Sequence, residues 1–212
     1  MRARALAGRT LGELGHALGF AMGDGTLRTK GKAGELVERA LGASAGATKA
    51  HDFPALGIEL KTIPVDERSK PRESTFLCTI ALADADRAEW STSWARSKLS
   101  HVLWVPIVTP LRGDTWERVI GAPIFWRPTA EQDAVLQADF DEIMGAVGIG
   151  AIEGLTARTG RWLQVRPKAQ TGSARTIVYG ADGETIATIP RGFYLRARFT
   201  GAILADPRAM PE

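Results

Sequence analysis

Apolar residues recur at the spacing of an amphipathic helix in three stretches of the chain. Residues 11–18 follow Thr10, a residue type that often caps a helix, and a glutamate stands three positions after it. Residues 33–41 gather their apolar side chains on one stripe. Residues 129–147 form the longest predicted helix, which begins with the capping pair Thr129 and Gln132. The pattern therefore predicts helices that each bury one face.

Short β-branched or apolar runs between these helices predict strands. Residues 57–63 are bounded by prolines, and residues 73–83 could pair with them through a hairpin turn. The nearly continuous apolar run at 101–108 is typical of a strand buried on both faces. Further elements are predicted at 90–97 (a helix or irregular segment), 117–126, 160–165 and 184–189 (strands), 190–192 (a break) and 193–204 (a strand, then a helix).

This mixture of helices and buried strands predicts an α/β fold around a mixed sheet. The chain has 212 residues, 44% of them hydrophobic, which is enough to bury a sizeable core. No Pro- or Ser-rich linker separates two independent domains, so residues 1–212 are expected to form one domain. No run of about 18 apolar residues is present, so no membrane span is expected. The single cysteine, Cys78, is expected to be a buried thiol in a cytoplasmic protein.

The chemistry-bearing pattern of the chain lies around its first predicted strand. Asp52, Glu59 and Lys61 follow one another in the order D-x6-E-x-K. Side chains two apart on a strand share a face, so Glu59 and Lys61 are expected to point the same way. Two carboxylates and an ammonium at one edge of a sheet can hold Mg²⁺ and activate water beside a phosphodiester. The alternative is a solvated strand that carries a surface ion pair.

Basic residues concentrate in the C-terminal third. The formal net charge is only +3, but residues 158–198 contain eight Arg or Lys residues against two acidic ones. A basic C-terminal part and a carboxylate-bearing N-terminal half suit a nucleic acid duplex that one part binds and the other cuts. A solvated basic face is the alternative interpretation.

The segment HDFPALGIELKTIPVD, residues 51–66, resembles the catalytic segment of the MutH mismatch repair endonucleases, which belong to the PD-(D/E)xK nuclease superfamily. Further similar segments follow in the family's order along most of the chain: AGRTLGELGHALG and KGKAGELVERALGASAG before it, and ESTFLCTIAL, SKLSHVLWVPI, WLQVRPKA and TIPRGFYLRARFT after it. Residues 109–116 and 170–184 depart most. The resemblance implies a restriction-endonuclease-like mixed β-sheet core flanked by helices. It also implies two lobes around a DNA-binding cleft, the N-terminal lobe catalytic and the C-terminal lobe basic and DNA-reading.

The resemblance also implies a metal site. Asp52, Glu59 and the backbone carbonyl of Leu60 would bind Mg²⁺, and Lys61 would orient or help to deprotonate the attacking water. Glu38 matches an additional acidic active-site residue of the family, which would allow a second cation, so one-metal and two-metal mechanisms both stay open. Lys98 matches a family lysine near the active site.

Six residues are candidates for reading DNA: Lys30, Phe76, Arg166, Pro167, Lys168 and Tyr194. Arginine or lysine can pair with guanine O6 and N7 in the major groove, although a contact to phosphate alone is the alternative for any single one of them. Tyr194 matches the family position associated with sensing adenine methylation, where a closely packed aromatic ring could clash with an N6-methyl group.

The resemblance therefore implies an Mg²⁺-dependent, sequence-specific DNA endonuclease. Such an enzyme nicks the unmethylated strand of double-stranded DNA at hemimethylated GATC sites in methyl-directed mismatch repair, is activated by MutL and acts as a monomer. A GATC-type restriction endonuclease and a catalytically inactive DNA-binding module are the alternatives. Histidines 16, 51 and 101 show no zinc-ligand spacing, and no G-x-x-x-x-G-K-[ST] run indicates an ATP site.

Overall fold

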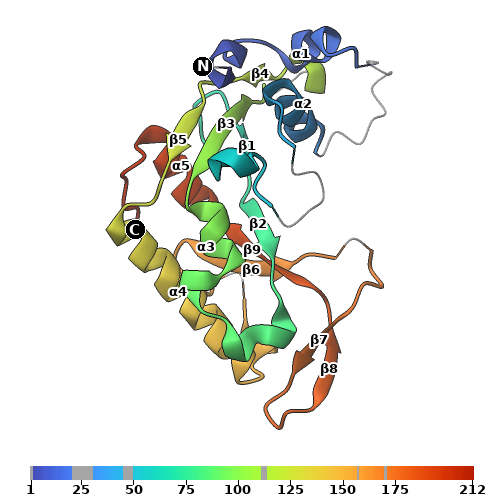
Figure 1. The fold of residues 1–212 in the computed structure, drawn as a ribbon, viewed down its shortest axis with the longest axis vertical. Helices are drawn as coiled ribbons and strands as arrows, with labels where there is room; N and C mark the ends of the chain where they lie inside the picture. Colours follow the sequence, from blue (N-terminus) through green and yellow to red (C-terminus); the bar gives the residue numbers. More distant parts are fainter. Residues whose placement is uncertain (1, 21–30, 45–49, 111–113, 157, 170) are drawn as a thin grey trace. The chain divides into compact units, whose positions relative to one another are not determined.

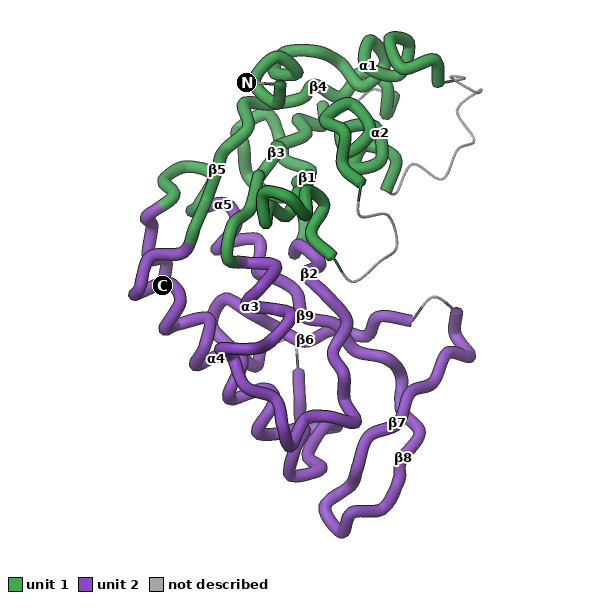
Figure 2. The backbone as a smooth tube through the Cα atoms, in the orientation of Figure 1, with its two compact units in different colours: residues 1–73, 100–127, 203–207 green, residues 74–99, 128–202, 208–212 purple. Residues whose placement is uncertain are grey.

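The computed structural model describes residues 2–20, 31–44, 50–110, 114–156, 158–169 and 171–212. The chain divides into two compact units, neither of which is continuous in sequence (Figure 2). Unit 1 comprises residues 1–73, 100–127 and 203–207, and unit 2 comprises residues 74–99, 128–202 and 208–212. Among the described residues, no helix is both long enough and apolar enough to cross a membrane.

Unit 1 is built on a mixed four-stranded sheet (Figure 1). Its central strand is β3 (Val102–Val108), which pairs in parallel with β1 (Glu59–Val65). Two short strands, β4 (Val119–Ile120) and β5 (Ile124–Trp126), pair antiparallel with β3. β3 is buried from Val102 to Ile107, which confirms the strand predicted from its apolar run. The single strand predicted over residues 117–126 is instead two strands, because a glycine and a proline separate them.

β1 differs from its predicted bounds at both ends. It begins at Glu59 because Gly57, with φ +60°, ends the short helix η2 (Pro54–Leu56) just before it. It also continues through Pro64, which was expected to end it. The amide of Glu59 donates to the carbonyl of His101, just before β3. Peptide groups alternate along a strand, so the peptide nitrogen of Pro64 faces away from β3. The missing N–H of proline therefore removes no hydrogen bond between β1 and β3.

Helices cover one face of this sheet. α1 (Leu11–Ala17) begins with the capping box of Thr10 and Glu13, and α2 (Lys32–Leu41) presents a buried apolar stripe, so both predicted helices are confirmed. The stripe packs with Ile58, just before β1, and with alternate residues of β1 and β3, among them Leu60 and Leu103. Two 3-10 helices, η1 (Ala3–Leu6) and η5 (Thr115–Glu117), complete the unit. Unit 1 therefore has a core on the α2 face of the sheet.

Unit 2 contains an antiparallel three-stranded sheet. Its middle strand β9 (Arg191–Leu195) pairs with β2 (Thr75–Thr79) on one side and with β6 (Leu163–Pro167) on the other. The predicted hairpin between β1 and β2 is therefore wrong. After β1 the chain turns at Asp66, and the contact between the two returning segments is limited to the isolated bridge of Val65 with Pro71.

The remaining elements of unit 2 are mostly helical. They are η3 (Leu82–Arg87), η4 (Trp90–Thr92), α3 (Trp94–Leu99), α4 (Ala130–Gly148) and η6 (Ile152–Gly154), with the hairpin of β7 (Thr176–Tyr179) and β8 (Thr185–Thr188). The boundary between the units falls within α5 (Ala197–Ala205). α4 begins with the predicted capping box of Thr129 and Gln132. Cys78 is buried in β2, as expected. β7 was not predicted, and residues 191–192 belong to β9 instead of a break.

A buried carboxylate joins α4 to the sheet of unit 2. Asp139, only 4% exposed, accepts hydrogen bonds from the backbone amides of Arg161, Trp162 and Leu163 at 2.6 to 2.7 Å. Gly160 precedes these amides with φ +75°, and a Cβ atom there would lie 2.0 Å from the carbonyl oxygen of Leu163. The start of β6 is therefore held by one side chain and by a turn that needs glycine.

We expect Asp139→Ala to lower the free energy of unfolding by about 3 kcal/mol, because it leaves buried backbone amides without a hydrogen-bond acceptor. Asp141→Ala is the matched control: it removes an exposed carboxylate from the same helix and should change the free energy by less than about 0.5 kcal/mol. Urea unfolding followed by circular dichroism measures both. Equal effects of the two substitutions would contradict this role of Asp139.

Candidate functional site

The free edge of β1 is occupied by a carboxylate. Oδ2 of Asp52 accepts a hydrogen bond from the backbone amide of Leu60 at 2.7 Å. Leu60 lies one residue after Glu59, whose amide faces β3, so both the amide and the carbonyl of Leu60 face away from β3. The carboxylate of Asp52 and the carbonyl oxygen of Leu60 therefore lie at the same edge.

Glu59 and Lys61 point to the face of β1 opposite α2. The side chain of Glu59 is only 1% exposed, and its Oε1 lies 2.7 Å from Nζ of Lys61, which is 18% exposed. Their partners across the ladder are Val102 and Trp104, two buried apolar residues of β3. A buried carboxylate is costly unless it is paired, so the ammonium offsets the burial of Glu59. The predicted common face is confirmed.

Glu38 approaches this group from α2. A Cβ atom built on Gly34 would have both Oε1 of Glu38 and Oγ1 of Thr62 within 4 Å, which places the carboxylate beside β1. The residue is exposed, but neighbouring atoms partly desolvate its carboxyl group. This burial raises the pKa of Glu38, the negative charge of Asp52 raises it further, and the positive charge of Lys61 lowers it. Glu38 is therefore in electrostatic contact with the D-x6-E-x-K residues.

His51 was not predicted to belong to this group. Its Nδ1 lies 3.8 Å from Oε2 of Glu59. The available signal was its place in the sequence, directly before Asp52, but spacing rules for metal-binding histidines do not test for a single histidine beside a carboxylate.

The donor set fits a hard divalent cation. The described residues contain no cluster of three or more His, Cys, Asp or Glu side chains arranged to hold a metal ion. A magnesium-like ion does not need one, because it commonly takes one or two carboxylates and completes its shell with water and substrate oxygens. Asp52, Glu59 and the Leu60 carbonyl provide oxygen atoms only, the first and last at the edge of β1 and Glu59 from its adjoining face.

A second group of predicted residues meets on one face of the sheet in unit 2. Phe76 of β2 and Tyr194 of β9 are direct cross-strand partners, with ring centroids 5.2 Å apart in an edge-to-face arrangement. Nζ of Lys168 lies 4.5 Å from the ring centroid of Phe76, and the guanidinium of Arg166 lies 6.0 Å from that of Tyr194. Arg166 also donates to Oγ of Ser74 at 2.8 Å. Two aromatic rings and two cations thus form one surface, which we call the reading face.

Gly192 leaves room for the side chains of the reading face to pack together. A Cβ atom at this position would lie 2.9 Å from Cε2 of Phe76 and 3.3 Å from Cβ of Lys168. Any larger residue would push these side chains apart. Pro167 has the opposite parity on β6 and pairs with Arg191, so its ring does not belong to the same face. On that opposite side of β9, Phe193 packs against Phe140 of α4.

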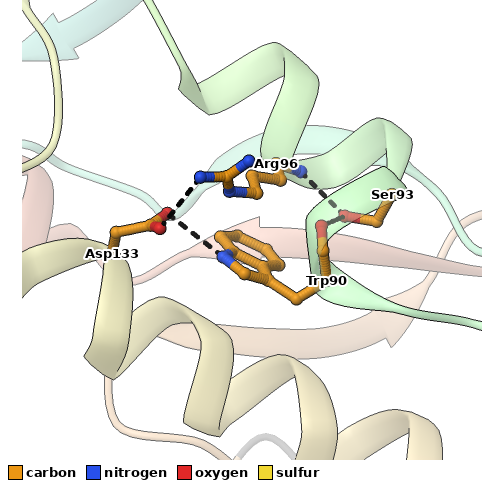
Figure 3. Close-up of polar contacts among 4 residues, drawn as sticks. All are labelled: Trp90, Ser93, Arg96 and Asp133. Atoms are coloured by element: carbon orange, nitrogen blue, oxygen red, sulfur yellow. Dashed lines mark hydrogen bonds and ion pairs between the residues drawn. The ribbon is translucent and has the colours of Figure 1, made fainter. Parts of the chain in front are cut away.

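Lys98 belongs to unit 2, whereas the four acidic and basic residues around β1 belong to unit 1. It lies on α3, where its Nζ is 5.0 Å from the ring centroid of Trp94. α3 is tied to α4, as Figure 3 shows: Asp133 accepts from the indole of Trp90 at 3.1 Å and pairs with Arg96 at 3.3 Å. The role of Lys98 beside the active site stays a prediction, and Lys30 lies outside the described residues.

Comparison with known proteins identifies a single family. Residues 41–139 match the family described as "DNA mismatch repair enzyme MutH". The DNA mismatch repair protein MutH of Escherichia coli (strain K12) is 45% identical over 204 residues, which cover 96% of this chain and 89% of the relative. The protein of the same name from Serratia proteamaculans (strain 568) is also 45% identical, over 96% of this chain and 90% of the relative.

We expect Glu38→Gln to stabilise the metal-free protein increasingly as the pH rises. A raised pKa means that the folded protein favours the protonated carboxyl of Glu38. The resulting contribution to the free energy of unfolding is complete below the pKa of the unfolded chain, about 4.3, and is lost as the pH rises through the pKa of the folded protein. The difference in the free energy of unfolding between variant and wild type should therefore grow as the pH rises above about 4.3, until Glu38 is ionised in the folded protein. Urea unfolding in the presence of a chelator measures it.

Glu142→Gln is the control, since it removes an exposed carboxylate from the polar side of α4. A difference for Glu38→Gln that is independent of pH, or matched by the control, would disprove the electrostatic coupling.

Proposed function

The chain belongs to the MutH family of DNA mismatch repair endonucleases, and from this premise we propose that it nicks the unmethylated strand at hemimethylated GATC sites. We further propose that the reaction depends on Mg²⁺, that the protein MutL activates it, and that the chain acts as a monomer in the cytoplasm. The endonuclease activity in mismatch repair follows from the family, whereas the recognition sequence, the metal and the activator are the proposal.

One observation carries the catalytic part of this proposal. The Asp52 carboxylate and the Leu60 carbonyl lie at one edge of β1, and Glu59, whose Oε1 is 2.7 Å from the ammonium of Lys61, projects from the adjoining face of the same strand. A divalent cation held by these oxygens would polarise the scissile phosphate and lower the pKa of a bound water. The arrangement supports Mg²⁺ because all three donors are oxygen atoms.

Lys61 has two tasks in this proposal. Its ammonium balances the buried charge of Glu59, and its remaining protons can donate to the attacking water or to a phosphate oxygen. Donation to the phosphate stabilises the negative charge that gathers there as water attacks phosphorus. Since Lys61 lies beside several carboxylates, we assign it electrostatic stabilisation and positioning rather than proton removal. Glu38 is the proposed additional carboxylate, available to a second cation.

The reading face supports recognition of duplex DNA. Arg166 is held by Ser74 and by the ring of Tyr194, which leaves a fixed guanidinium of the kind that pairs with guanine O6 and N7. Lys168 and Phe76 form the adjacent part of the surface. The adenine of GATC carries its N6-methyl group in the major groove, where Tyr194 would leave no room for it. Pro167 and Lys30 complete the proposed contacts to DNA.

We expect Asp52→Ala, Glu59→Ala and Lys61→Ala each to lower nicking of a GATC duplex at least about a hundredfold while DNA binding survives, because each forfeits about 3 kcal/mol of transition-state stabilisation. Asp52→Asn refines the test, since an amide oxygen can still accept from Leu60 but the ligand charge is lost. Glu67→Ala, an exposed carboxylate shortly after β1, is the control and should nick normally. Near-normal activity in any of the first three variants would overturn the assignment.

We expect Tyr194→Ser to narrow the difference in nicking rate between hemimethylated and fully methylated GATC duplexes by about tenfold, because removing an overpacked ring relieves about 1–3 kcal/mol. The other tyrosine of the chain, Tyr179, is half exposed on β7, so Tyr179→Ser is a matched control that should leave the ratio unchanged. A Tyr194→Ser enzyme that is slower on both duplexes by the same factor would leave the ring a structural role only. Cleavage of both strands of unmethylated DNA at similar rates would instead indicate a restriction endonuclease.

A further inference from the structure

Unit 1 carries an apolar groove of about 770 Å³, whose described lining includes none of the predicted site residues. One side is formed by the segment that follows Asp52, including Phe53, Leu56 and Ile58, and another by Phe125 of β5. Leu56 is 67% exposed and Phe125 is 56% exposed, which are high values for large apolar side chains. Exposed apolar surface that lines a groove marks a site where another molecule is bound.

The charge of the groove restricts the occupant. Arg2 and Arg4, both exposed, lie on its rim at the short helix η1, and none of the described residues that line the groove is acidic. A duplex phosphate backbone would find cations here, but it would have no use for the apolar floor. A peptide segment with apolar side chains flanked by carboxylates complements both features, and this is how amphipathic segments bind apolar grooves.

The groove is also connected to the active site through the backbone. The amide of Phe53 donates to the carbonyl of Ile58 at 3.0 Å, and the amide of Ile58 returns a hydrogen bond to Phe53 at 3.3 Å. This closed turn joins Asp52 to Glu59 directly, so it sets the distance between the two proposed metal ligands. A molecule that fills the groove rests on the turn that positions both carboxylates.

We propose that the groove is the docking site for an acidic amphipathic segment of the activating protein, and that docking raises the nicking rate by holding the turn from Asp52 to Glu59. The inference rests on the proposed activation by MutL. A bound segment can shift the turn only if it binds the catalytically competent arrangement more tightly than the other arrangements. Contact with Phe53 and Ile58 provides the means, because these residues form the closing bridge of the turn.

The test compares nicking of a hemimethylated GATC duplex with Mg²⁺, with and without purified MutL, for wild type and three variants. Phe125→Asp places a charge on the apolar wall of the groove outside the turn from Asp52 to Glu59, and the double variant Arg2→Glu, Arg4→Glu reverses the charge of its rim. Ile149→Asp is the matched control, because Ile149 is a comparably exposed apolar residue (70%) in unit 2. We expect both groove variants to keep wild-type activity without MutL and to lose at least tenfold of the stimulation, whereas Ile149→Asp keeps it.

Three results would overturn the inference. Full stimulation of both groove variants would show that MutL binds elsewhere while its role as activator stands. An equal loss of activity with and without MutL would give the groove residues a structural role alone, and thermal unfolding of each variant identifies that case. A concentration-dependent dimer of the wild type that Phe125→Asp abolishes would assign the groove to a second copy of the chain. A wild type that MutL does not stimulate at all would instead remove the proposed activation itself.

Discussion

A single hydrogen bond at the free edge of β1 organises the proposed active site. Edge strands leave amides without a partner, and the amide of Leu60 is satisfied by the carboxylate of Asp52, which is thereby fixed in place. Peptide alternation then directs the carbonyl of Leu60 to the same edge, while side-chain alternation directs Glu59 and Lys61 perpendicular to it. The oxygen donors therefore gather at the start of β1 for three reasons: an edge amide needs an acceptor, successive peptide groups alternate in direction, and successive side chains alternate between the two faces.

The same corner concentrates negative charge. Glu59 is buried and depends on Lys61 for compensation, and Glu38 has a raised pKa because of burial and the charge of Asp52. Carboxylates brought together in this way repel one another and oppose folding, and a bound cation would relieve the repulsion. The sheet tolerates this repulsion because its central strand, β3, is buried along almost its whole length.

Local signals in the sequence predicted the elements better than their pairing. The caps at Thr10 and Thr129 and the apolar run of β3 depend on neighbouring residues, and the structure confirms all three. The partner of β1 could not be predicted in the same way, because parallel pairing with β3 depends on contacts about forty residues apart. The prediction that Pro64 ends β1 was wrong for a related reason. A proline is tolerated in a strand where its nitrogen faces away from the neighbouring strand, and the sequence alone does not specify this direction.

The number of basic residues in the C-terminal third does not by itself show which of them are available to contact DNA. Several of its arginines donate to backbone carbonyls within unit 2: Arg161 to Pro211, Arg196 to Thr159 and Gly160, and Arg198 to Arg161. Their charges still attract DNA at a distance, but their side chains are committed to the fold and cannot also reach a base. Arg166 and Lys168 differ because the register of β6 and β9 places them beside aromatic rings on the reading face. Strand register therefore places two of the eight cations on the reading face, and the proposed recognition of DNA would depend on it.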